Sequence, residues 1–512
     1  MLRGLLLFGA LFASACARPS PPRAPARAPD VIVITVDTLR ADRVGAYGYA
    51  SARTATIDAL ARRGVRFANA ITPQPRTTPA LASMWTGLSP HRHGAREVLF
   101  PRRAGTTLAE VLAARGYATR AVSANRAASA ETNLDTGFER FELRTGEDAS
   151  VVTAVARELL DAPPEAPLLL WAHYLDPHAP YRAPDAAAAP ETPACAAIQA
   201  EGRRAEMQTN RGGHSEAALP DCSRAYDAEI AWVDAQIATL LDALRAAGRL
   251  KRAFVVFTSD HGEGLGERGL WYEHGPNVHA SNLDVPLSIG GPGIAGGGVV
   301  EVPVSLIDLA PTLLELLEVP PSERPTDVDG ESVVPWLRGE RAEPRRVVAE
   351  AADALIPEFA ETLIAGHPTT GYCAHGATFA LCWRSPREPA TLHERASDPD
   401  HRADVSAAHP EVYDALTLVR ARWAPRGTRE HAVSDGRYKL VHRPRLEGGY
   451  ARALYDRASD PGETRDVAEA EPAIADRLEA ALEAWERQLP GRDPIALSPQ
   501  QEEALRALGY IR

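Results

Sequence analysis

The chain has 512 residues, enough for one large domain and a smaller one, because a single hydrophobic core stops growing at about 250–300 residues. It carries 56 Lys and Arg against 68 Asp and Glu, a net charge of −12, and the sequence has no basic cluster interleaved with aromatics. This balance argues against nucleic acid as a partner.

The N-terminus has the pattern of an export signal. A basic residue, Arg3, precedes an apolar run from Leu5 to Phe12 that is too short to span a bilayer, and Ala-Ser-Ala-Cys ends at Cys16. Residues 1–16 therefore predict a lipoprotein-type signal peptide, with ordinary cleavage at a small-residue site as the alternative. We expect a periplasmic or outer-membrane protein whose membrane contact is a lipid anchor on Cys16. The Pro-rich residues 17–29 predict an extended tether.

Strand and helix patterns alternate after the tether. The apolar, β-branched run VIVITV predicts a strand buried on both faces. Thr56 and Gly64 are the expected N-cap and C′ residues of one helix, and Thr107 with Glu110 forms a capping-box pattern for another. Further strands are expected at TRAVSAN, PLLLWAHYL, AFVVFTSD and VPLSIGG, and an amphipathic helix at DAEIAWVDAQIATLLDALRAAG. Residues 30–340 thus predict an α/β domain with a mainly parallel sheet sandwiched by helices.

Residues 341–512 predict a smaller C-terminal α+β auxiliary domain. They contain an internal repeat, because LHERASDPDHRADV at 392–405 matches LYDRASDPGETRDV at 454–467. Each copy precedes a helical run that ends near a tryptophan, Trp423 or Trp485. We interpret the copies as two similar turn-plus-helix units, since a duplicated Asp-Pro turn is more often structural than catalytic.

With Cys16 set aside, four cysteines remain, which suits an oxidising compartment. Four cysteines allow three pairings. We favour the two local pairs, Cys195 with Cys222 and Cys373 with Cys382, because each closes a loop that has no other staple.

Candidate chemistry lies where two expected strands end. Asp37 follows VIVITV, and Asp260 and His261 end AFVVFTSD, so the rim of a parallel sheet brings them together. Two carboxylates and an imidazole suit one divalent cation, and Ca²⁺, Mg²⁺, Mn²⁺ and Zn²⁺ all remain open. Such a cation lowers the pKa of a hydroxyl, and Thr77 and Thr78 offer one in PRTTPALASMWTG.

Several longer stretches carry a family pattern, in this order along the chain: VDTLRADRVGAYGY, IDALARRGVRFANA, TPALASMWTGLSPHRHG, DPHAPY, FTSDHGEGLGERG, HGPNVHASNLDVPL, VDGESVVPWLRG, GRYKLVHRP, LYDRASDPGETRDV and LRALGYIR. In them the chain resembles the sulfatases of the alkaline phosphatase superfamily over nearly its whole mature length. The resemblance implies an alkaline-phosphatase-like fold and a metal-dependent hydrolase of sulfate or phosphate esters.

The resemblance also implies the site. Asp37, Thr77, Asp260 and His261 would form one metal site, with Thr77 as both ligand and nucleophile. Sulfatases oxidise a Cys or Ser at this position to the aldehyde formylglycine. Threonine carries a methyl group on Cβ, so the same oxidation could give only a ketone. The motif's Arg is also missing, because Leu81 stands in its place. The chain therefore resembles the superfamily members that use a Thr alkoxide without formylglycine.

Three further residues match positions near the substrate in that family. His178 and His274 correspond to residues that touch the transferred group or the leaving oxygen. The alternative for His178 is a turn residue bonded to the backbone. Asn125 lies in SANRAAS, which replaces a segment that supplies a Lys and a His in sulfatases, and it is a candidate oxyanion contact.

Three functions fit these patterns. The first is a hydrolase of sulfate or phosphate esters whose substrate is a small molecule or a glycan or lipid ester. The second is a phosphoglycerol- or phosphoethanolamine-type transferase of the cell envelope, which the lack of membrane spans in the sequence disfavours. The third is a non-catalytic protein that binds a sulfated or phosphorylated glycan, because several of the family's motif residues are missing.

Overall fold

A computed structural model describes residues 28–161, 166–181, 183–184, 219–267, 271–341, 343–352, 354–355, 363–367, 371–375, 378–383, 389–398, 401–422, 429–444 and 450–489. The predicted signal peptide with Cys16, most of the tether, Cys195 and Trp423 lie outside these residues. Among the helices it describes, none combines the length and the hydropathy needed to cross a membrane.

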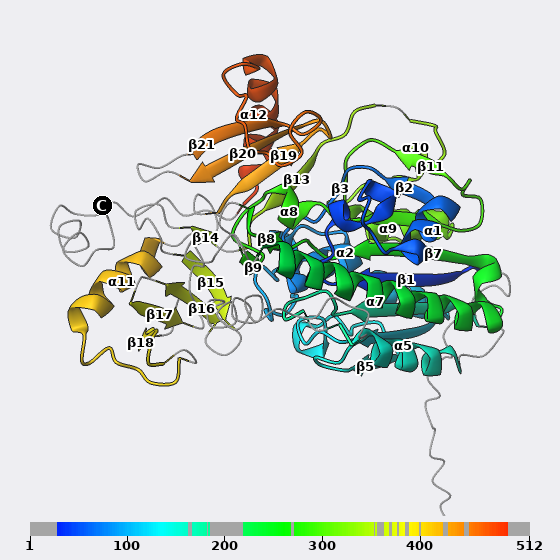
Figure 1. Cartoon of the computed structure of the whole chain (residues 1–512), viewed down its shortest axis with the longest axis horizontal. Coiled ribbons are helices and arrows are strands. Elements are labelled where there is room, and N and C mark those ends of the chain that lie inside the picture. Colours follow the sequence, from blue (N-terminus) through cyan, green and yellow to red (C-terminus); the bar gives the residue numbers. More distant parts are fainter. Residues whose placement is uncertain are drawn as a thin grey trace, which may run out of the picture.

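An eight-stranded sheet forms the centre of the molecule, in the order β11-β2-β10-β7-β1-β6-β4-β5 (Figure 1). β10 is antiparallel to both of its neighbours, and every other neighbouring pair is parallel. The predicted mainly parallel α/β fold is therefore confirmed. The strands are β1 (Asp30–Val36), β2 (Val65–Phe67), β4 (Ala118–Ser123), β5 (Arg140–Leu143), β6 (Leu168–Tyr174), β7 (Ala253–Ser259), β10 (Leu287–Gly290) and β11 (Gly298–Val300).

Helices cover both faces of this sheet, as Figure 1 shows for α7 across the front. Ile32 and Ile34 of β1 pack in the cluster that includes α5 and α7, whereas Val31 and Val33 pack in the cluster that includes α2, α4 and α9. Both faces of β1 are buried, which explains its continuous apolar run. These helices are α1 (Ala55–Arg63), α2 (Thr77–Thr86), α4 (Leu108–Ala114), α5 (Ala149–Glu158), α7 (Leu219–Ala246) and α9 (Leu309–Leu316).

The predicted N-cap of the first helix, Thr56, is wrong. α1 begins at Ala55 with Thr54 in the N-cap position, and Gly64 follows its last residue as predicted. The N–H groups of Thr56 and Ile57 donate to the carboxylate of Asp234 in α7, at 3.0 and 2.8 Å. A side chain distant in the sequence therefore satisfies these helix-end donors, so local sequence gave no signal for it.

The predicted capping box of α4 is confirmed. The Thr107 hydroxyl accepts from the Glu110 backbone N–H at 3.0 Å, and the Glu110 carboxylate accepts from the Thr107 N–H at 2.8 Å. Both partners lie within one helical turn, which is why the sequence alone could find this cap.

Antiparallel sheets follow in the C-terminal part, as expected for an α+β region. One has the order β13-β19-β20-β21 and packs against α12, and the other has the order β14-β15-β16-β17-β18, with α11 beside β16 and β17. The division at residue 340 stays a prediction. The elements are β13 (Val347–Glu350), β14 (Ala354–Leu355), β15 (Leu363–His367), β16 (Gly371–His375), β17 (Phe379–Trp383), β18 (Thr391–Glu394), α11 (Pro410–Arg422), β19 (His431–Ser434), β20 (Tyr438–Pro444), β21 (Tyr450–Asp456) and α12 (Pro472–Glu486).

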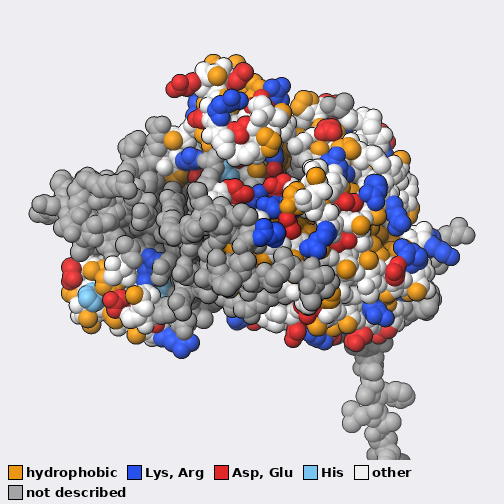
Figure 2. Space-filling model, in the orientation of Figure 1, with side chains coloured by type: hydrophobic (Ala, Val, Ile, Leu, Met, Phe, Trp, Pro, Cys, Tyr) orange, Lys and Arg blue, Asp and Glu red, His pale blue; other side chains and the backbone are white. Residues whose placement is uncertain are grey.

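Short elements complete the described part of the chain: β3 (Ala70–Ile71), α3 (Pro90–His93), β8 (Gly264–Leu265), β9 (Trp271–Glu273), α8 (Ala280–Leu283), β12 (Val304–Ser305) and α10 (Val334–Leu337). On the face shown in Figure 2, Lys and Arg side chains are interspersed with Asp and Glu over the described surface.

The internal repeat forms two equivalent turn-plus-helix units, as predicted. In the first, Asp398 accepts from the backbone N–H of Ala403, and Asp404 accepts from that of Leu392. In the second unit, the equivalent bonds run from Arg465 to Asp460 and from Leu454 to Asp466. α11 and α12 follow the two turns. The same carboxylates thus organise the same turn in two different sheets.

One favoured disulfide is present, because Cys373 and Cys382 are bonded across β16 and β17. Cys222 is also disulfide-bonded, and the predicted partner Cys195 lies outside the described residues.

Candidate active site

The carboxyl ends of three neighbouring central strands supply the candidate site. β1 pairs in parallel with β6 on one side and with β7 on the other, so that Val36 lies opposite Tyr174 and Ser259. Asp37 follows β1 directly, Asp260 follows β7, and His173 is the penultimate residue of β6. The topology therefore places their side chains at one edge of the sheet, where ligands bind in open α/β folds.

The four residues predicted as a metal site meet there. The Thr77 Oγ1 lies 3.5 Å from Asp37 Oδ2 and 3.4 Å from His261 Nε2. His261 Nε2 in turn lies 3.3 Å from Asp260 Oδ2 and 3.8 Å from Asp37 Oδ1. All four side chains are buried. Four segments far apart in the sequence thus present oxygen and nitrogen donors to one small volume.

The two carboxylates fit a cation. Asp37 Oδ1 and Asp260 Oδ2 are buried and have no hydrogen-bond partner among the residues that the structure describes. Burial, together with the negative charge of Asp37, raises the pKa of Asp260 to about 8. Burial also opposes ionisation of Asp37, but the adjacent imidazoles of His173, His178 and His261 bring its pKa below the usual range. Two buried carboxyl groups this close need a positive charge between them when both are ionised.

His261 is a neutral imidazole at this position and can offer a lone pair to a cation. Burial lowers its pKa to about 4, although the charge of Asp37 acts in the opposite direction. Its Nδ1–H donates to the carbonyl of Gly262 at 2.9 Å, so the lone pair of Nε2 faces the carboxylates. This tautomer is the one that a histidine metal ligand needs.

His173 belongs to the same cluster, and the sequence analysis missed it. Donor atoms of Asp37, His173 and Asp260 all lie within 4.8 Å of one another. His173 Nε2 is 3.4 Å from Asp37 Oδ2, and its Nδ1 is 2.8 Å from the hydroxyl of Thr35. A histidine at the end of an otherwise apolar strand, next to the strand that carries Asp37, was the available signal.

Thr77 and Thr78 differ in what holds their hydroxyl groups. The Thr78 hydroxyl donates to the carbonyl of Ala127 at 2.8 Å and accepts from the N–H of Leu99 at 3.0 Å. The Thr77 hydroxyl instead faces the donor cluster from the first residue of α2, where the helix dipole favours negative charge. Of the two threonines, Thr77 is therefore the one placed to act as a nucleophile.

Asn125 points a donor at the same place. Its Oδ1 accepts from the N–H of Ala127 at 2.8 Å, which fixes the orientation of the amide. Its Nδ2 then lies 2.5 Å from Asp37 Oδ2 and 3.4 Å from the Thr77 Oγ1. The structure therefore places this predicted substrate contact beside the Thr77 hydroxyl, with an N–H directed into the site.

The predicted catalytic histidines lie on the other side of His261. The His274 ring is 4.3 Å from that of His261 and 5.3 Å from that of His178, measured between centroids. Burial, then the charges of His261, Arg76 and His178, hold the pKa of His274 well below its usual range. The Nδ1 of His178 donates to the carbonyl of Ala179 at 2.7 Å, the backbone bond foreseen as the alternative reading of this residue. That bond uses only Nδ1 of His178, and the ring still lies beside that of His274. The backbone bond is therefore compatible with a position in the site.

Two further residues were not predicted. The Glu263 carboxylate lies 3.1 Å from His274 Nδ1 and fixes the orientation of that ring. Arg76 precedes Thr77, and its positive charge lowers the pKa of both His261 and His274. Glu263 lies within the DHGE string and Arg76 within PRTTPA, so each is adjacent to a predicted residue in sequence.

The turn that carries Asp37 into the site is strained. Thr38, a β-branched residue, has a φ of 53°, and its N–H donates to Asp260 Oδ1 at 3.2 Å. A left-handed backbone at such a residue costs about 1–3 kcal/mol, which the surrounding contacts must offset. The hydrogen bond links the ends of β1 and β7 and sets the spacing of their two carboxylates.

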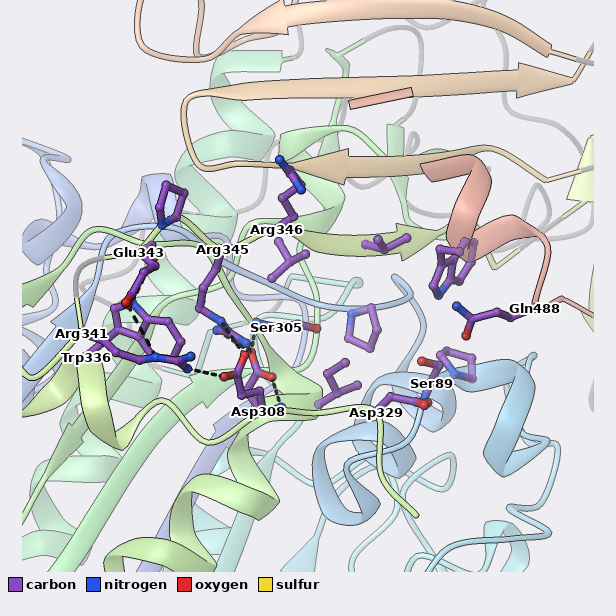
Figure 3. A pocket seen from close by; sticks show the side chains of 18 residues that line it. Ser89, Ser305, Asp308, Asp329, Trp336, Arg341, Glu343, Arg345, Arg346 and Gln488 are labelled. Atoms are coloured by element: carbon purple, nitrogen blue, oxygen red, sulfur yellow. Dashed lines mark hydrogen bonds and ion pairs between the residues drawn. The ribbon is translucent and has the colours of Figure 1, made fainter. Parts of the chain in front are cut away.

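A separate cavity of about 510 Å³ is lined by residues of α3, β12, α10, β13 and α12 and of the segments around them (Figure 3). None of the predicted site residues lines it. Most of its charged side chains pair with one another or with near neighbours. Asp308 pairs with Arg345 (Figure 3), and Asp329 pairs with Arg92. Most of the charge that lines this cavity is therefore paired within the protein.

Comparison with known proteins gives the family. A family model described as Sulfatase matches residues 29–319, which include every residue of the site. The chain belongs to the sulfatase family. Its homologues and structural neighbours are sulfatase-family hydrolases of the alkaline phosphatase superfamily, which confirms the resemblance.

Among its relatives, the choline-sulfatase of Rhizobium meliloti (strain 1021) is 35% identical over 227 residues. That match covers 42% of this sulfatase-family chain and 43% of the choline-sulfatase, so it spans less than half of either protein.

Two solved structures share the fold over almost the whole chain. The phosphonate monoester hydrolase of Agrobacterium radiobacter has a TM-score of 0.62 at 21% identity, and the match covers 92% of this sulfatase-family chain and 100% of that protein. A protein solved in complex with its substrate D-glucosamine-2-N,6-O-disulfate has a TM-score of 0.62 at 18% identity, covering 91% and 99%. The sulfatase architecture therefore extends through the C-terminal sheets.

Proposed function

We propose that this protein is a metal-dependent hydrolase of sulfate or phosphate esters that uses Thr77 as its nucleophile, without formylglycine. The observation that carries the proposal is the position of the Thr77 hydroxyl, at the start of α2 and 3.4–3.5 Å from both Asp37 and His261. A threonine cannot yield the aldehyde, so the oxygen already present must attack.

Asp37, Asp260, His261 and Thr77 would hold one divalent cation, and His173 orients Asp37 beside it. When bound, the cation supplies a Lewis acid that lowers the pKa of the coordinated hydroxyl and neutralises charge on a substrate oxygen. The identity of the cation is left open among Ca²⁺, Mg²⁺, Mn²⁺ and Zn²⁺, because the donors are oxygen and imidazole nitrogen.

The protein's own groups then account for both halves of the reaction. The Thr77 hydroxyl releases its proton to solvent and its Oγ1 attacks sulfur or phosphorus, while the bond to the leaving oxygen breaks and that oxygen takes a proton from His274 or His178. The product is an ester on Thr77. Water then attacks the same sulfur or phosphorus, one of its protons goes to the histidine that gave one up and the other to Oγ1 as the bond to Oγ1 breaks, and sulfate or phosphate leaves. The N–H of Asn125 stabilises negative charge on a non-bridging oxygen in both steps.

The substrate class follows from the relatives. The names reported above include a choline-sulfatase, a phosphonate monoester hydrolase and a protein bound to a disulfated glucosamine. These support a small-molecule or glycan ester as the substrate, and they favour hydrolysis over the transferase and over the non-catalytic glycan-binding protein.

Export is part of the proposal, with Cys16 as the lipidated residue. The disulfide between Cys373 and Cys382 supports an oxidising compartment. Labelling cells with a fatty-acid analogue tests the anchor, because wild type should incorporate the label and Cys16→Ser should not.

The nucleophile is tested with a panel of aryl sulfates, phosphate monoesters, phosphodiesters and phosphonate monoesters, each assayed with the four cations. We expect Thr77→Ala to lower kcat by at least about 10³-fold on every substrate that wild type turns over. Thr78→Ser is the matched control, because its hydroxyl is retained for Ala127 and Leu99, and it should keep wild-type kcat.

Trapping the intermediate gives independent evidence. Wild type quenched during turnover of a phosphonate or phosphate ester should carry the added mass on the peptide that contains Thr77. An unmodified Thr77 peptide under burst conditions, together with an active Thr77→Ala, would refute the mechanism. If wild type binds the esters but turns over none of them with any cation, and Thr77→Ala binds them equally well, the result would indicate the non-catalytic alternative.

A further inference from the structure

A second group of metal-type donors lies in the first repeat unit, away from the active site. Cys373 in β16, Cys382 in β17 and His401 in the turn before α11 are all buried. His401 Nδ1 lies 3.5 Å from the sulfur of Cys373 and 3.3 Å from that of Cys382. The two cysteines are direct cross-strand partners with Cα atoms 4.1 Å apart.

These distances are those of a zinc-type site. Tetrahedral coordination with metal–sulfur bonds of about 2.3 Å and a metal–nitrogen bond of about 2.0 Å separates sulfur from nitrogen by about 3.5 Å. The His401 nitrogen already stands at that distance from both sulfurs. The same geometry requires about 3.8 Å between the two sulfurs, which directly opposed residues on adjacent strands can adopt once they are no longer bonded.

The oxidation state decides whether the site exists. In the disulfide neither sulfur is a thiolate, and a thiolate is the form that binds metal. An external dithiol can break the S–S bond by supplying two electrons and two protons, and it leaves as its own disulfide. Binding of one divalent cation by the two resulting thiols then releases two protons.

The second repeat unit shows that the fold itself does not need these side chains. Its strands β19 and β20 pair Ala432 with Val441, as β16 and β17 pair Cys373 with Cys382. The match follows from the repeat, in which Leu392 corresponds to Leu454. Their cross-strand partners Leu381 and Leu440 therefore correspond, and the next residues, Cys382 and Val441, correspond as well. The same turn, hydrogen bonds and helix thus form with small apolar residues in place of the cysteines.

The residue matching His401 is Glu463, and both have a left-handed backbone, with φ of 52° and 54°. Glu463 has a different task, because its carboxylate lies 2.5 Å from Lys439 Nζ and 2.8 Å from His279 Nδ1. It therefore joins the second unit to the catalytic domain. Of the two repeat units, only the first therefore contains this set of two cysteines and a histidine.

We propose that Cys373, Cys382 and His401 form a redox-controlled metal site, which is a disulfide when oxidised and binds one zinc-class cation when reduced. Three protein ligands leave the fourth tetrahedral position to water or to an external ligand. The site is independent of the active site, which contains no sulfur among its described donors.

The test uses the full-length protein, freed of metal, in oxidised form and after reduction by a phosphine without oxygen. Co²⁺ is the probe, because a thiolate–cobalt bond gives a near-ultraviolet charge-transfer band that oxygen and nitrogen donors do not give. We expect the reduced protein to bind one more Co²⁺ per chain than the oxidised protein and to gain that band. Asp260→Asn should weaken cobalt binding at the active site and leave this increment unchanged.

The control variant takes its residues from the second repeat unit. The double variant Cys373→Ala, Cys382→Val should lose both the extra Co²⁺ and the band, while any other cysteine in the chain stays in place. His401→Ala should keep the band and weaken binding at least tenfold. Circular dichroism checks folding, and if the double variant is misfolded, the His401→Ala result decides. No extra Co²⁺ in reduced wild type, or an equal band in the double variant, would overturn the proposal.

Discussion

Replacing Asp260 by asparagine separates the electrostatic cost of holding two carboxylates close together from the geometry of the candidate site. Asp260 Oδ1 accepts from the N–H groups of Thr38 and His261, at 3.2 and 2.9 Å. The amide oxygen of Asp260→Asn can keep both bonds. The substitution then changes only Oδ2, the buried oxygen with no hydrogen-bond partner, and removes its charge.

The expected magnitude follows from the pKa of Asp260, which burial and the charge of Asp37 raise from 3.8 to about 8 in the metal-free protein. Between these two values the unfolded chain has lost the proton that the folded protein still binds. Stability of the metal-free protein therefore falls as the pH rises, by about 1.4 kcal/mol per unit and about 4 kcal/mol by pH 7. Above about pH 8 the fall stops, and below about pH 4 the contribution vanishes. Asp260→Asn lacks this pH dependence.

The assay is thermal unfolding of wild type and Asp260→Asn at pH 5 and pH 8, with and without each cation. Without metal, Asp260→Asn should melt above wild type at pH 8, with a smaller difference at pH 5. With metal at about 100 times its Kd, wild type should gain about 2.7 kcal/mol and the variant much less.

Asp308→Asn is the matched control, because Asp308 is equally buried but pairs with Arg345 at 3.0 Å. It should lose about 1–3 kcal/mol equally with and without cations. A wild type whose melting temperature at pH 8 responds to none of the four cations would refute the reasoning, as would an Asp260→Asn variant that keeps the full response.

The remaining predictions concern the residues around this pair. Asn125→Ala should lower kcat/KM by about 10²-fold, measured by steady-state kinetics, because it removes the N–H directed at Asp37 and Thr77; an unchanged value would remove Asn125 from the site. His274→Gln should slow esters with poor leaving groups by about 10²-fold or more and aryl esters much less, since a good leaving group needs no proton; equal loss on both would contradict a role as acid. Thr107→Ala should cost about 1 kcal/mol in thermal unfolding, with activity retained, because it removes the capping box of α4.

Local patterns in the sequence were enough to predict the central strands β1, β4, β6, β7 and β10. The run VIVITV is apolar at every position because both faces of β1 are covered, and that pattern is visible in the sequence without any coordinates. The capping box at Thr107 and the repeat at 392–405 were also readable, since their hydrogen bonds join residues close in the chain. Asp37, Asp260 and His261 could be predicted because each stands at the end of such a strand.

Contacts between distant segments decided the rest. Residue type alone does not distinguish Thr77 from Thr78, and only the family resemblance favoured Thr77; in the structure they differ because Ala127 and Leu99 hold the hydroxyl of Thr78. His173 reads as part of a buried strand until the pairing of β1 with β6 sets it beside Asp37. The true cap of α1 comes from Asp234 in α7. Residue type and local spacing thus identified polar side chains that could belong to the site. Which of them lie together in it depends on strand pairing and helix packing, because these bring together groups that no local pattern connects.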